Sequence, residues 1–259
     1  MSSSNLPPLL FVHGMCGTAA AWDHYRSFFE AQGFDCHVPS LRHHAAQLSA
    51  ADRQALGQTS LTDYADDLEA LIQTLPAKPV IIGHSMGGLI TQLLAARGLA
   101  QAVVLLTPAP PAGVLALKPS VLRTFAKITN RWNFWKKPFR FDVQAANYGI
   151  YNNLPAQQQQ DEYAKLVDES GRAAFEIGYW FIDRRHASRV EAQQVTCPML
   201  VIGASRDRIT PASVVRQVAR KYPQANYREY PQFAHFLLSE AGWETVAQDL
   251  SQWIRAQAA

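Results

Sequence analysis

Short apolar segments alternate with longer segments of helical periodicity along this chain. The apolar segments are too short to form helices, and six of them are expected to be strands. These are residues 9–12, 35–38, 80–82, 102–106, 199–203 and 226–230. Strands that alternate with helices along the sequence predict an α/β protein, in which helices cover a parallel sheet.

The clearest expected helix spans residues 61–75. Its apolar residues fall on one stripe, and Ser60 lies three residues before Asp63 in the pattern of a capping box. Pro211 is expected at the first helical position of another helix, because proline is favoured there. Further helices are expected to begin near Ala20, Met86 and Ser239.

The fourth and fifth expected strands are separated by roughly 90 residues, far more than a usual connection in an α/β unit. We therefore expect a core formed by residues 1–107 and 196–259, and a helical cap formed by residues 108–195. The cap begins with a Pro-rich hinge and holds most of the aromatic side chains. It is expected to be helical over 161–166, with residues 157–160 as the first turn after Pro155. This composition is typical of a lid over a pocket.

The third expected strand runs directly into Gly83-His84-Ser85-Met86-Gly87, and an apolar helical segment follows. This is the pattern G-x-S-x-G in a strand–turn–helix context, where a sharp turn lifts the serine above the sheet. The close approach of strand and helix leaves room only for glycine on either side of the turn. Ser85 is therefore the candidate nucleophile. The alternative is an ordinary strand-to-helix turn with a capping serine.

A serine hydroxyl needs a base to become a nucleophile, and the oxyanion that it forms needs hydrogen-bond donors. The first expected strand ends in a Gly-rich loop, residues 13–17, at the carboxyl edge of the sheet. The backbone N–H groups of Met15 and Met86 are expected to form the oxyanion hole. Cys16, in the same loop, is either a small packing residue or part of the floor of the acyl pocket.

Among eight histidines, His235 is the candidate base because it lies on the loop after the last expected strand, at the same edge of the sheet. His13 and His84 lie inside the two turns, where imidazoles bonded to nearby backbone are expected. The candidate acid is Asp207, which follows the fifth expected strand and lies between nucleophile and base in the sequence. The alternative for His235 is an ordinary core or surface histidine, and the alternative for Asp207 is a carboxylate on a surface loop.

The order of Ser85, Asp207 and His235, the H-G-x-x-G loop and the G-H-S-M-G-G turn together resemble the alpha/beta-hydrolase superfamily over residues 9–254. That family usually has an antiparallel strand pair before the H-G motif. This chain has no room for the pair, so a six-stranded, mainly parallel sheet is expected. The short N-terminal part is similar to the polyneuridine-aldehyde-esterase and methylesterase branch.

The resemblance implies that Ser85 attacks a carbonyl, that His235 transfers its proton, and that Asp207 orients the imidazole, with no metal or organic cofactor. Hydroxynitrile lyases of this branch carry Lys beside the catalytic His, where this chain has Phe236. Lyase chemistry is thus disfavoured. Dehalogenases and epoxide hydrolases of the superfamily use an Asp nucleophile, and the serine argues against both. Ala234 departs from the Gly that the family commonly has before the His.

Composition limits the function further. The chain has 259 residues, 48% hydrophobic and 17% charged, which excludes disorder, collagen and coiled coil. A net charge of +3 is too close to balance to indicate a nucleic-acid partner. Three cysteines imply no disulfide framework and favour the cytoplasm. Residues 1–5 lack the basic segment of a signal peptide, and the longest uncharged stretch, 98–117, contains three prolines, so no transmembrane segment is expected.

The charge is unevenly distributed. Residues 114–141 contain seven basic and no acidic residues, while the rest of the chain has 17 basic and 21 acidic ones. Trp132 and Trp135 lie among these basic residues and are expected, with Cys16, to border the substrate pocket. The segment either contacts a lipid interface or an anionic acyl substrate, or is a solvated helix whose aromatic side chains pack on the core.

We therefore expect a serine hydrolase that cleaves a small-molecule carboxylic ester with a small or medium apolar acyl group. The same triad would also serve a thioesterase, a lactonase, a carbon–carbon bond hydrolase or a perhydrolase. A hydrolase-fold ligand-binding protein is the alternative from another class of function.

Overall fold

A computed structural model describes residues 6–258, and the sequence expectation for residues 1–5 lies outside this range. The main sheet has six strands in the order β2-β1-β3-β4-β7-β8, and all its pairings are parallel. Its strands are β1 (Leu9–Val12), β2 (Cys36–His37), β3 (Val80–His84), β4 (Ala102–Leu106), β7 (Met199–Ala204) and β8 (Ala225–Tyr230). The predicted six-stranded α/β class is confirmed.

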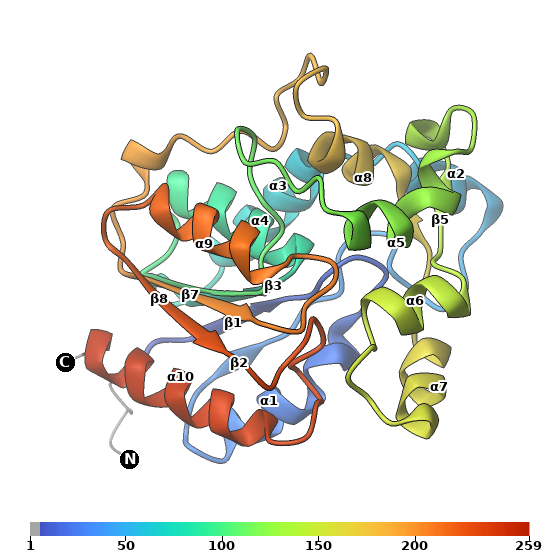
Figure 1. Ribbon diagram of the computed structural model, residues 1–259. Helices are drawn as coiled ribbons and strands as arrows, with labels where there is room; N and C mark the ends of the chain where they lie inside the picture. The colour runs from blue at the N-terminus through green and yellow to red at the C-terminus, as the bar shows by residue number, and fades with distance from the viewer. Residues whose placement is uncertain (1–5, 259) are drawn as a thin grey trace.

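Helices cover both faces of this sheet, with α3, α4 and α9 on one face and α1 and α10 on the other (Figure 1). These helices span Asp23–Glu30 (α1), Leu61–Ile72 (α3), Met86–Ala96 (α4), Ala212–Arg220 (α9) and Trp243–Ala258 (α10). The same part of the chain also holds η1 (Ala19–Trp22), η3 (Ala192–Gln194) and α2 (Ala50–Leu56), the last of which lies beside β5 (Pro138–Phe139) (Figure 1). Successive residues of a strand point to opposite faces, so Leu9 and Phe11 pack beneath α1 and α10, while Leu10 and Val12 pack against α3 and α4. This two-sided burial explains why the central strands are uniformly apolar.

The segment between β4 and β7 forms a separate layer at the right of Figure 1, beside the carboxyl ends of the strands. It contains α5 (Pro119–Thr129), η2 (Phe134–Lys136), α6 (Val143–Gly149), α7 (Ala156–Ala164) and α8 (Gly171–Gly178), with the antiparallel pair β5 (Pro138–Phe139) and β6 (Glu169–Ser170). The predicted turn after Pro155 is confirmed as the start of α7. The division of the chain into core and cap at residues 108–195 stays a prediction.

Several predicted boundaries differ from the observed ones. The capping box is present, because the Ser60 backbone N–H donates to Asp63 Oδ2 at 2.8 Å, but α3 ends at Ile72 rather than at residue 75. Pro211 precedes α9 as its cap, in extended conformation, instead of occupying its first turn. The last helix begins at Trp243, later than predicted, because residues 235–242 form turns in which Glu240 accepts the Ala234 N–H at 2.9 Å.

In the part of the chain covered by the structure, no helix combines the length and the apolar character needed to cross a membrane.

Candidate active site

Ser85 lies in a tight turn between β3 and α4. Its backbone has φ 53° and ψ −120°, a conformation that residues other than glycine rarely adopt. The turn is held by neighbouring backbone, because the Ser85 N–H donates to the Leu106 carbonyl at 3.0 Å and its own carbonyl accepts the Ala109 N–H at 2.8 Å. A Cβ on Gly87 would lie 2.1 Å from the Val12 carbonyl oxygen, so β1 and α4 can approach only because this residue is glycine.

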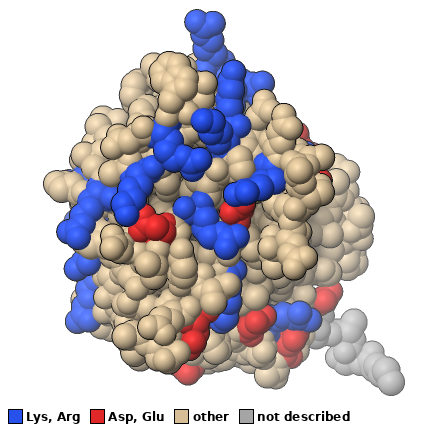
Figure 2. Space-filling view, turned by 90° about the vertical axis from the view of Figure 1, so that its right-hand side faces the viewer, with Lys and Arg blue, Asp and Glu red and all other residues tan. Residues whose placement is uncertain are grey.

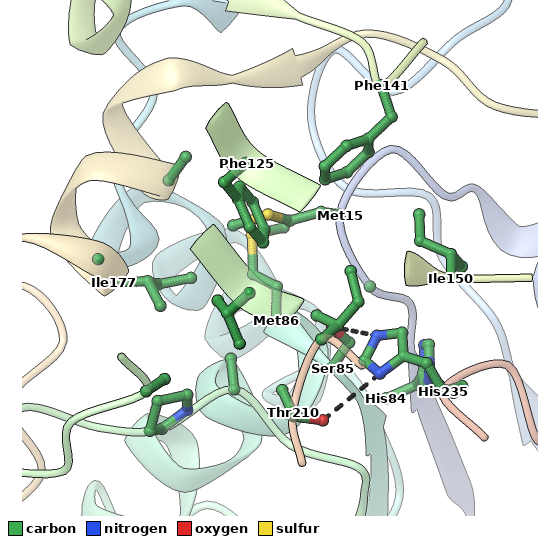
Figure 3. A pocket seen from close by; sticks show the side chains of 18 of the residues that line it. Met15, His84, Ser85, Met86, Phe125, Phe141, Ile150, Ile177, Thr210 and His235 are labelled. Carbon is green, nitrogen blue, oxygen red and sulfur yellow. Dashed lines mark hydrogen bonds between the residues drawn. The ribbon is translucent and has the colours of Figure 1, made fainter. Parts of the chain in front are cut away.

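The structure brings together three residues that are far apart in the sequence. The Ser85 Oγ lies 3.0 Å from the His235 Nε2, and the His235 Nδ1 lies 2.8 Å from the Asp207 Oδ2. All three side chains are buried. Figure 3 shows the serine and the imidazole pointing toward each other at one side of a pocket. The arrangement is that of a nucleophile, a base and an orienting acid.

The Asp207 carboxylate is held by the start of the loop into α9. Its Oδ1 accepts the backbone N–H groups of Ile209 at 2.7 Å and Thr210 at 2.8 Å, and its Oδ2 lies 2.8 Å from the Thr210 hydroxyl. Burial alone would raise the pKa of Asp207, but the attraction of His235 and these hydrogen bonds outweigh it, so the pKa lies below its usual range. A charged Asp207 accepts a hydrogen bond from the protonated His235 Nδ1 and thereby leaves the Nε2 lone pair facing Ser85.

The two other histidines of these turns, His13 and His84, are bonded to backbone groups, as the sequence predicted. The His84 Nε2 donates to the His235 carbonyl at 2.8 Å, and the His13 Nε2 accepts the Leu41 N–H at 3.0 Å. Burial, together with a neighbouring histidine, lowers the pKa of each to about 3. Both imidazoles are therefore neutral, and the ring nitrogens named here are already hydrogen-bonded to backbone groups.

Met15 and Met86 border the pocket next to Ser85 (Figure 3). Within residues 6–258, neither backbone N–H donates a hydrogen bond to another protein group. The loop that carries Met15 lies against the nucleophile, since a Cβ on Gly14 would be 2.9 Å from the Ser85 Cβ. The two N–H groups are thus free for a substrate oxygen, and their role as an oxyanion hole stays a prediction.

A pocket of about 250 Å³ opens beside Ser85 and His235. Its lining is predominantly apolar, and most of it comes from the segment between β4 and β7. Prominent lining residues are Val121, Phe125, Phe141, Ile150 and Ile177. An apolar pocket with a few polar groups at one end is the usual form of a small-molecule site.

The residues predicted to border the pocket, Cys16, Trp132 and Trp135, are not among those that line it. Cys16 is fully buried and packs in the core behind the loop, and it does not line the pocket. Trp132 is 80% exposed, and Trp135 packs against Phe134 and Phe175. The sequence showed that aromatic side chains gather in this segment, but the turn around η2 decides which of them face inward.

Sequence reasoning gave Thr210 no role beyond a helix start, although its hydroxyl bonds both Asp207 and the Thr107 carbonyl, the latter at 2.9 Å. The spacing between acid and threonine is short enough that an Asx-type turn could have been read from the sequence. No group of three His, Cys, Asp or Glu side chains suited to holding a metal ion occurs within residues 6–258.

Comparison with known sequences places this geometry in a wider context. The family model described as the alpha/beta hydrolase fold matches residues 7–241. ABHD8 from Bos taurus is 24% identical over 250 residues, which cover 95% of this chain and 55% of that protein. The chain thus spans just over half the length of the ABHD8 relatives. Monoacylglycerol lipase from Mycolicibacterium smegmatis is 26% identical over 259 residues, with 95% of this chain and 87% of that protein covered.

Among solved structures, the methylesterase MES16 from Arabidopsis superposes with a TM-score of 0.72, at 16% identity. The superposition covers 96% of this chain and 99% of that chain. The predicted likeness to the methylesterase branch is therefore confirmed at the level of the fold.

Proposed function

The chain belongs to the alpha/beta-hydrolase family, and on that premise we propose that it is a serine hydrolase. Its substrate is a carboxylic ester with a small or medium apolar acyl group, and the reaction passes through an acyl-enzyme. The observation that carries this proposal is the chain of hydrogen bonds from Ser85 through His235 to Asp207, at 3.0 and 2.8 Å, beside an apolar pocket.

In the proposed reaction, the Ser85 Oγ attacks the ester carbonyl while the His235 Nε2 takes its proton. The charge that develops on the carbonyl oxygen is stabilised by the N–H groups of Met15 and Met86. His235 then returns the proton to the departing alcohol, and a water molecule activated by the same imidazole releases the acid. Loss of one oxyanion donor costs roughly 3 kcal/mol of transition-state stabilisation, so the positions of the two backbone N–H groups add a substantial part of the rate to that of the triad.

The pocket supports an apolar acyl group of limited size. Its volume of about 250 Å³ is just below the range of roughly 300–1,000 Å³ that is usual for ligand sites. Residues 108–195 supply most of its lining, and we assign them the role of a cap over the acyl group. One relative is named a monoacylglycerol lipase, and a substrate with an ester-linked acyl group agrees with that name.

We further propose that the cap docks on an anionic lipid surface. Exposed apolar residues at the pocket support this proposal. The pocket lining includes four apolar residues that are each more than half exposed: Leu115, Leu117, Leu122 and Phe181. Side chains of this kind at a pocket opening suit an amphiphilic substrate that is taken from a lipid layer.

Basic side chains accompany these apolar ones. Figure 2 shows the face that bears α5, α6 and β5, where Lys and Arg gather in a band across the upper half with few acidic side chains among them. Two of the seven basic residues of 114–141 pair with aspartates. Lys118, Arg131 and Lys136 form no ion pair within the described part of the chain and are exposed. Unpaired cations beside exposed apolar groups attract anionic lipids.

Vesicle sedimentation tests the lipid contact. We expect the wild type to bind phosphatidylglycerol vesicles and not phosphatidylcholine vesicles. A variant that combines Lys118→Glu and Arg131→Glu should bind at least about tenfold more weakly, because each basic residue near such a surface contributes about 1 kcal/mol. The matched control, Lys78→Glu with Arg220→Glu, carries the same change of charge at the amino ends of the strands and should bind as the wild type does. Equal binding of phosphatidylglycerol vesicles by both variants would contradict the lipid proposal.

A panel of p-nitrophenyl esters with increasing acyl length tests the hydrolase itself. We expect turnover by the wild type with a burst of nitrophenol, and a loss of at least about a thousandfold in Ser85→Ala. Ser213→Ala, at an exposed position of α9, serves as the control and should keep full activity. Activity that survives in Ser85→Ala would overturn the nucleophile. If the wild type turns over no ester, thioester or lactone, the ligand-binding alternative replaces the proposal.

A further inference from the structure

A buried carboxylate from the cap reaches the loop that carries Met15. Glu169 lies in β6 and is fully buried. Its Oε2 accepts the Cys16 N–H at 3.1 Å and faces the His44 Nε2 at 3.0 Å. Its Oε1 accepts the Tyr64 hydroxyl at 2.9 Å and its neighbour's N–H, that of Ser170, at 2.6 Å. Both carboxylate oxygens thus have two partners each, which fixes the position and orientation of the group.

His44 makes this carboxylate a member of an ion pair. The His44 Nδ1 lies 3.0 Å from the Arg42 carbonyl, and its Nε2 lies 3.0 Å from Glu169. Since both neighbours are acceptors, both ring nitrogens must carry a proton, and the imidazole is cationic. The attraction between the two groups, despite their burial, raises the pKa of His44 and lowers that of Glu169. The neutral His13 ring lies 5.0 Å away, centroid to centroid.

Cys16 is held at both of its backbone polar groups by the cap. Its N–H donates to Glu169, and its carbonyl accepts the Val167 N–H at 2.9 Å. Its φ of 59° lies in the left-handed region, which costs a non-glycine residue roughly 1–2 kcal/mol. The conformation persists because these two bonds from residues 167–169 hold it. Met15, the next residue toward the N-terminus, inherits its orientation from this fixed point.

We propose that Glu169 is a positioning residue, which holds the loop of residues 13–17 so that the Met15 N–H faces the oxyanion of the reacting ester. The inference rests on the proposed serine-hydrolase function, because an oxyanion forms only in that reaction. It also assigns the cap a second task besides lining the pocket. Through Glu169, the cap completes the oxyanion hole of the core.

The matched test compares two buried carboxylates that the same segment presents to the core. Glu169→Gln removes the charge that holds the loop. Glu176→Gln removes the charge that accepts the Ser60 hydroxyl and the Leu61 N–H, both at 2.9 Å, at the start of α3. We expect kcat to fall about 10- to 100-fold in Glu169→Gln with KM within twofold, because the donor acts only in the transition state. Glu176→Gln should keep kcat within twofold.

Two further measurements separate positioning from general damage. A trifluoromethyl ketone, which forms a tetrahedral oxyanion on the nucleophile, should bind more weakly to Glu169→Gln by the same factor as the fall in kcat. Hydrogen exchange of residues 14–17 should become faster in this variant, and that readout does not require activity. If the wild type hydrolyses nothing while the exchange result holds, the proposed function fails and the anchoring of the loop stands.

The proposal is overturned if Glu169→Gln keeps wild-type kcat, if KM rises while kcat is unchanged, or if both Gln variants lose activity equally. Should Glu169→Gln not fold, Tyr64→Phe decides the question, because it removes one hydrogen bond from the carboxylate and keeps its charge. A fall in kcat of about threefold or more, with KM unchanged, supports the proposal. An unchanged kcat in a folded Tyr64→Phe contradicts it.

Discussion

The imidazole of His84 donates a hydrogen bond from its Nε2 to the backbone carbonyl of His235, at 2.8 Å. The residue before the proposed nucleophile thus fixes the backbone of the proposed base. A second donor, the Thr107 hydroxyl, reaches the same carbonyl at 3.3 Å from the end of β4. The proposed base is therefore held in place by β3, which leads into Ser85, and by the end of β4, and not only by its own loop.

Replacing His84 by phenylalanine should lower kcat by about tenfold. The variant keeps a ring of similar size but leaves the His235 carbonyl with its longer bond only, at a loss of about 1–1.5 kcal/mol. Steady-state kinetics with a p-nitrophenyl ester measure the effect. Thr107→Val, which removes the weaker donor, serves for comparison and should have the smaller effect; the reverse order would contradict this view of the turn.

Asp207→Asn should lower kcat by about 10⁴-fold. The amide is a weaker acceptor than a carboxylate for the hydrogen bond from the His235 Nδ1. The imidazole is then no longer held with its Nε2 lone pair toward Ser85. Thr210→Val removes one hydrogen bond from the carboxylate and should cost only about tenfold. If kcat falls no further in Asp207→Asn than in Thr210→Val, the Asp207 carboxylate is not the group that orients His235.

Ile177→Trp should shorten the acyl chain that the pocket accepts. Ile177 lines the pocket and points into it (Figure 3), so a larger side chain removes space near its inner wall. We expect kcat/KM for an octanoyl ester to fall at least about tenfold, which corresponds to roughly 1.4 kcal/mol, and that for an acetyl ester to change little. The control is Ile182→Trp, which is 58% exposed and lies outside the pocket lining. Equal losses for both esters would show that this wall does not contact the acyl group.

Gly87→Ala should destabilise the protein by at least about 3 kcal/mol, because its Cβ would meet the backbone of β1 and neither element can yield alone. Gly33→Ala is the matched control. Its φ of 85° costs about 1 kcal/mol for alanine, but nothing lies within 4 Å of the added Cβ. Urea unfolding of the two variants measures the difference, and similar losses would rule out the steric explanation.

Glu176 should make stability depend on pH between about 4.5 and 7. Burial raises its pKa to about 7, against the opposing effects of Leu61, Ser60 and Arg172. The folded state therefore binds this proton more tightly than the unfolded state does. Its contribution to stability is complete below pH 4.5 and is lost as the pH rises through 7.

Relative to Glu176→Gln, the free energy of unfolding of the wild type should increase by up to about 3 kcal/mol between pH 8 and pH 4.5. Denaturant titrations at several pH values give this quantity. A difference between wild type and variant that is constant with pH would contradict the prediction. The hydrogen bonds from the Leu61 N–H and the Ser60 hydroxyl, and after them the ion pair with Arg172 at 3.1 Å, oppose this rise in pKa and limit the increase.

Local patterns were sufficient for much of the fold. The apolar segments of β1, β3, β4 and β7 and the capping box at Ser60 depend on neighbours in the sequence, so they could be predicted. The same holds for the candidate triad, because nucleophile, acid and base each follow a strand, and the carboxyl ends of parallel strands meet at one edge. The boundaries that were wrong, such as the start of α10, depend on turns held by side chains from elsewhere, including Asn153 on Glu240.

The sequence by itself determined the order of strands and helices, the turn that strains Ser85 and the three residues of the candidate triad. Only the tertiary structure decided which side chains line the pocket and which carboxylate holds the loop of Met15. Glu169 and Cys16 are 153 positions apart, and no periodicity links a residue of the cap to a loop of the core. Which aromatic side chains of the cap face inward, and which buried acid finds four donors, depends on how the segment packs after the chain has folded.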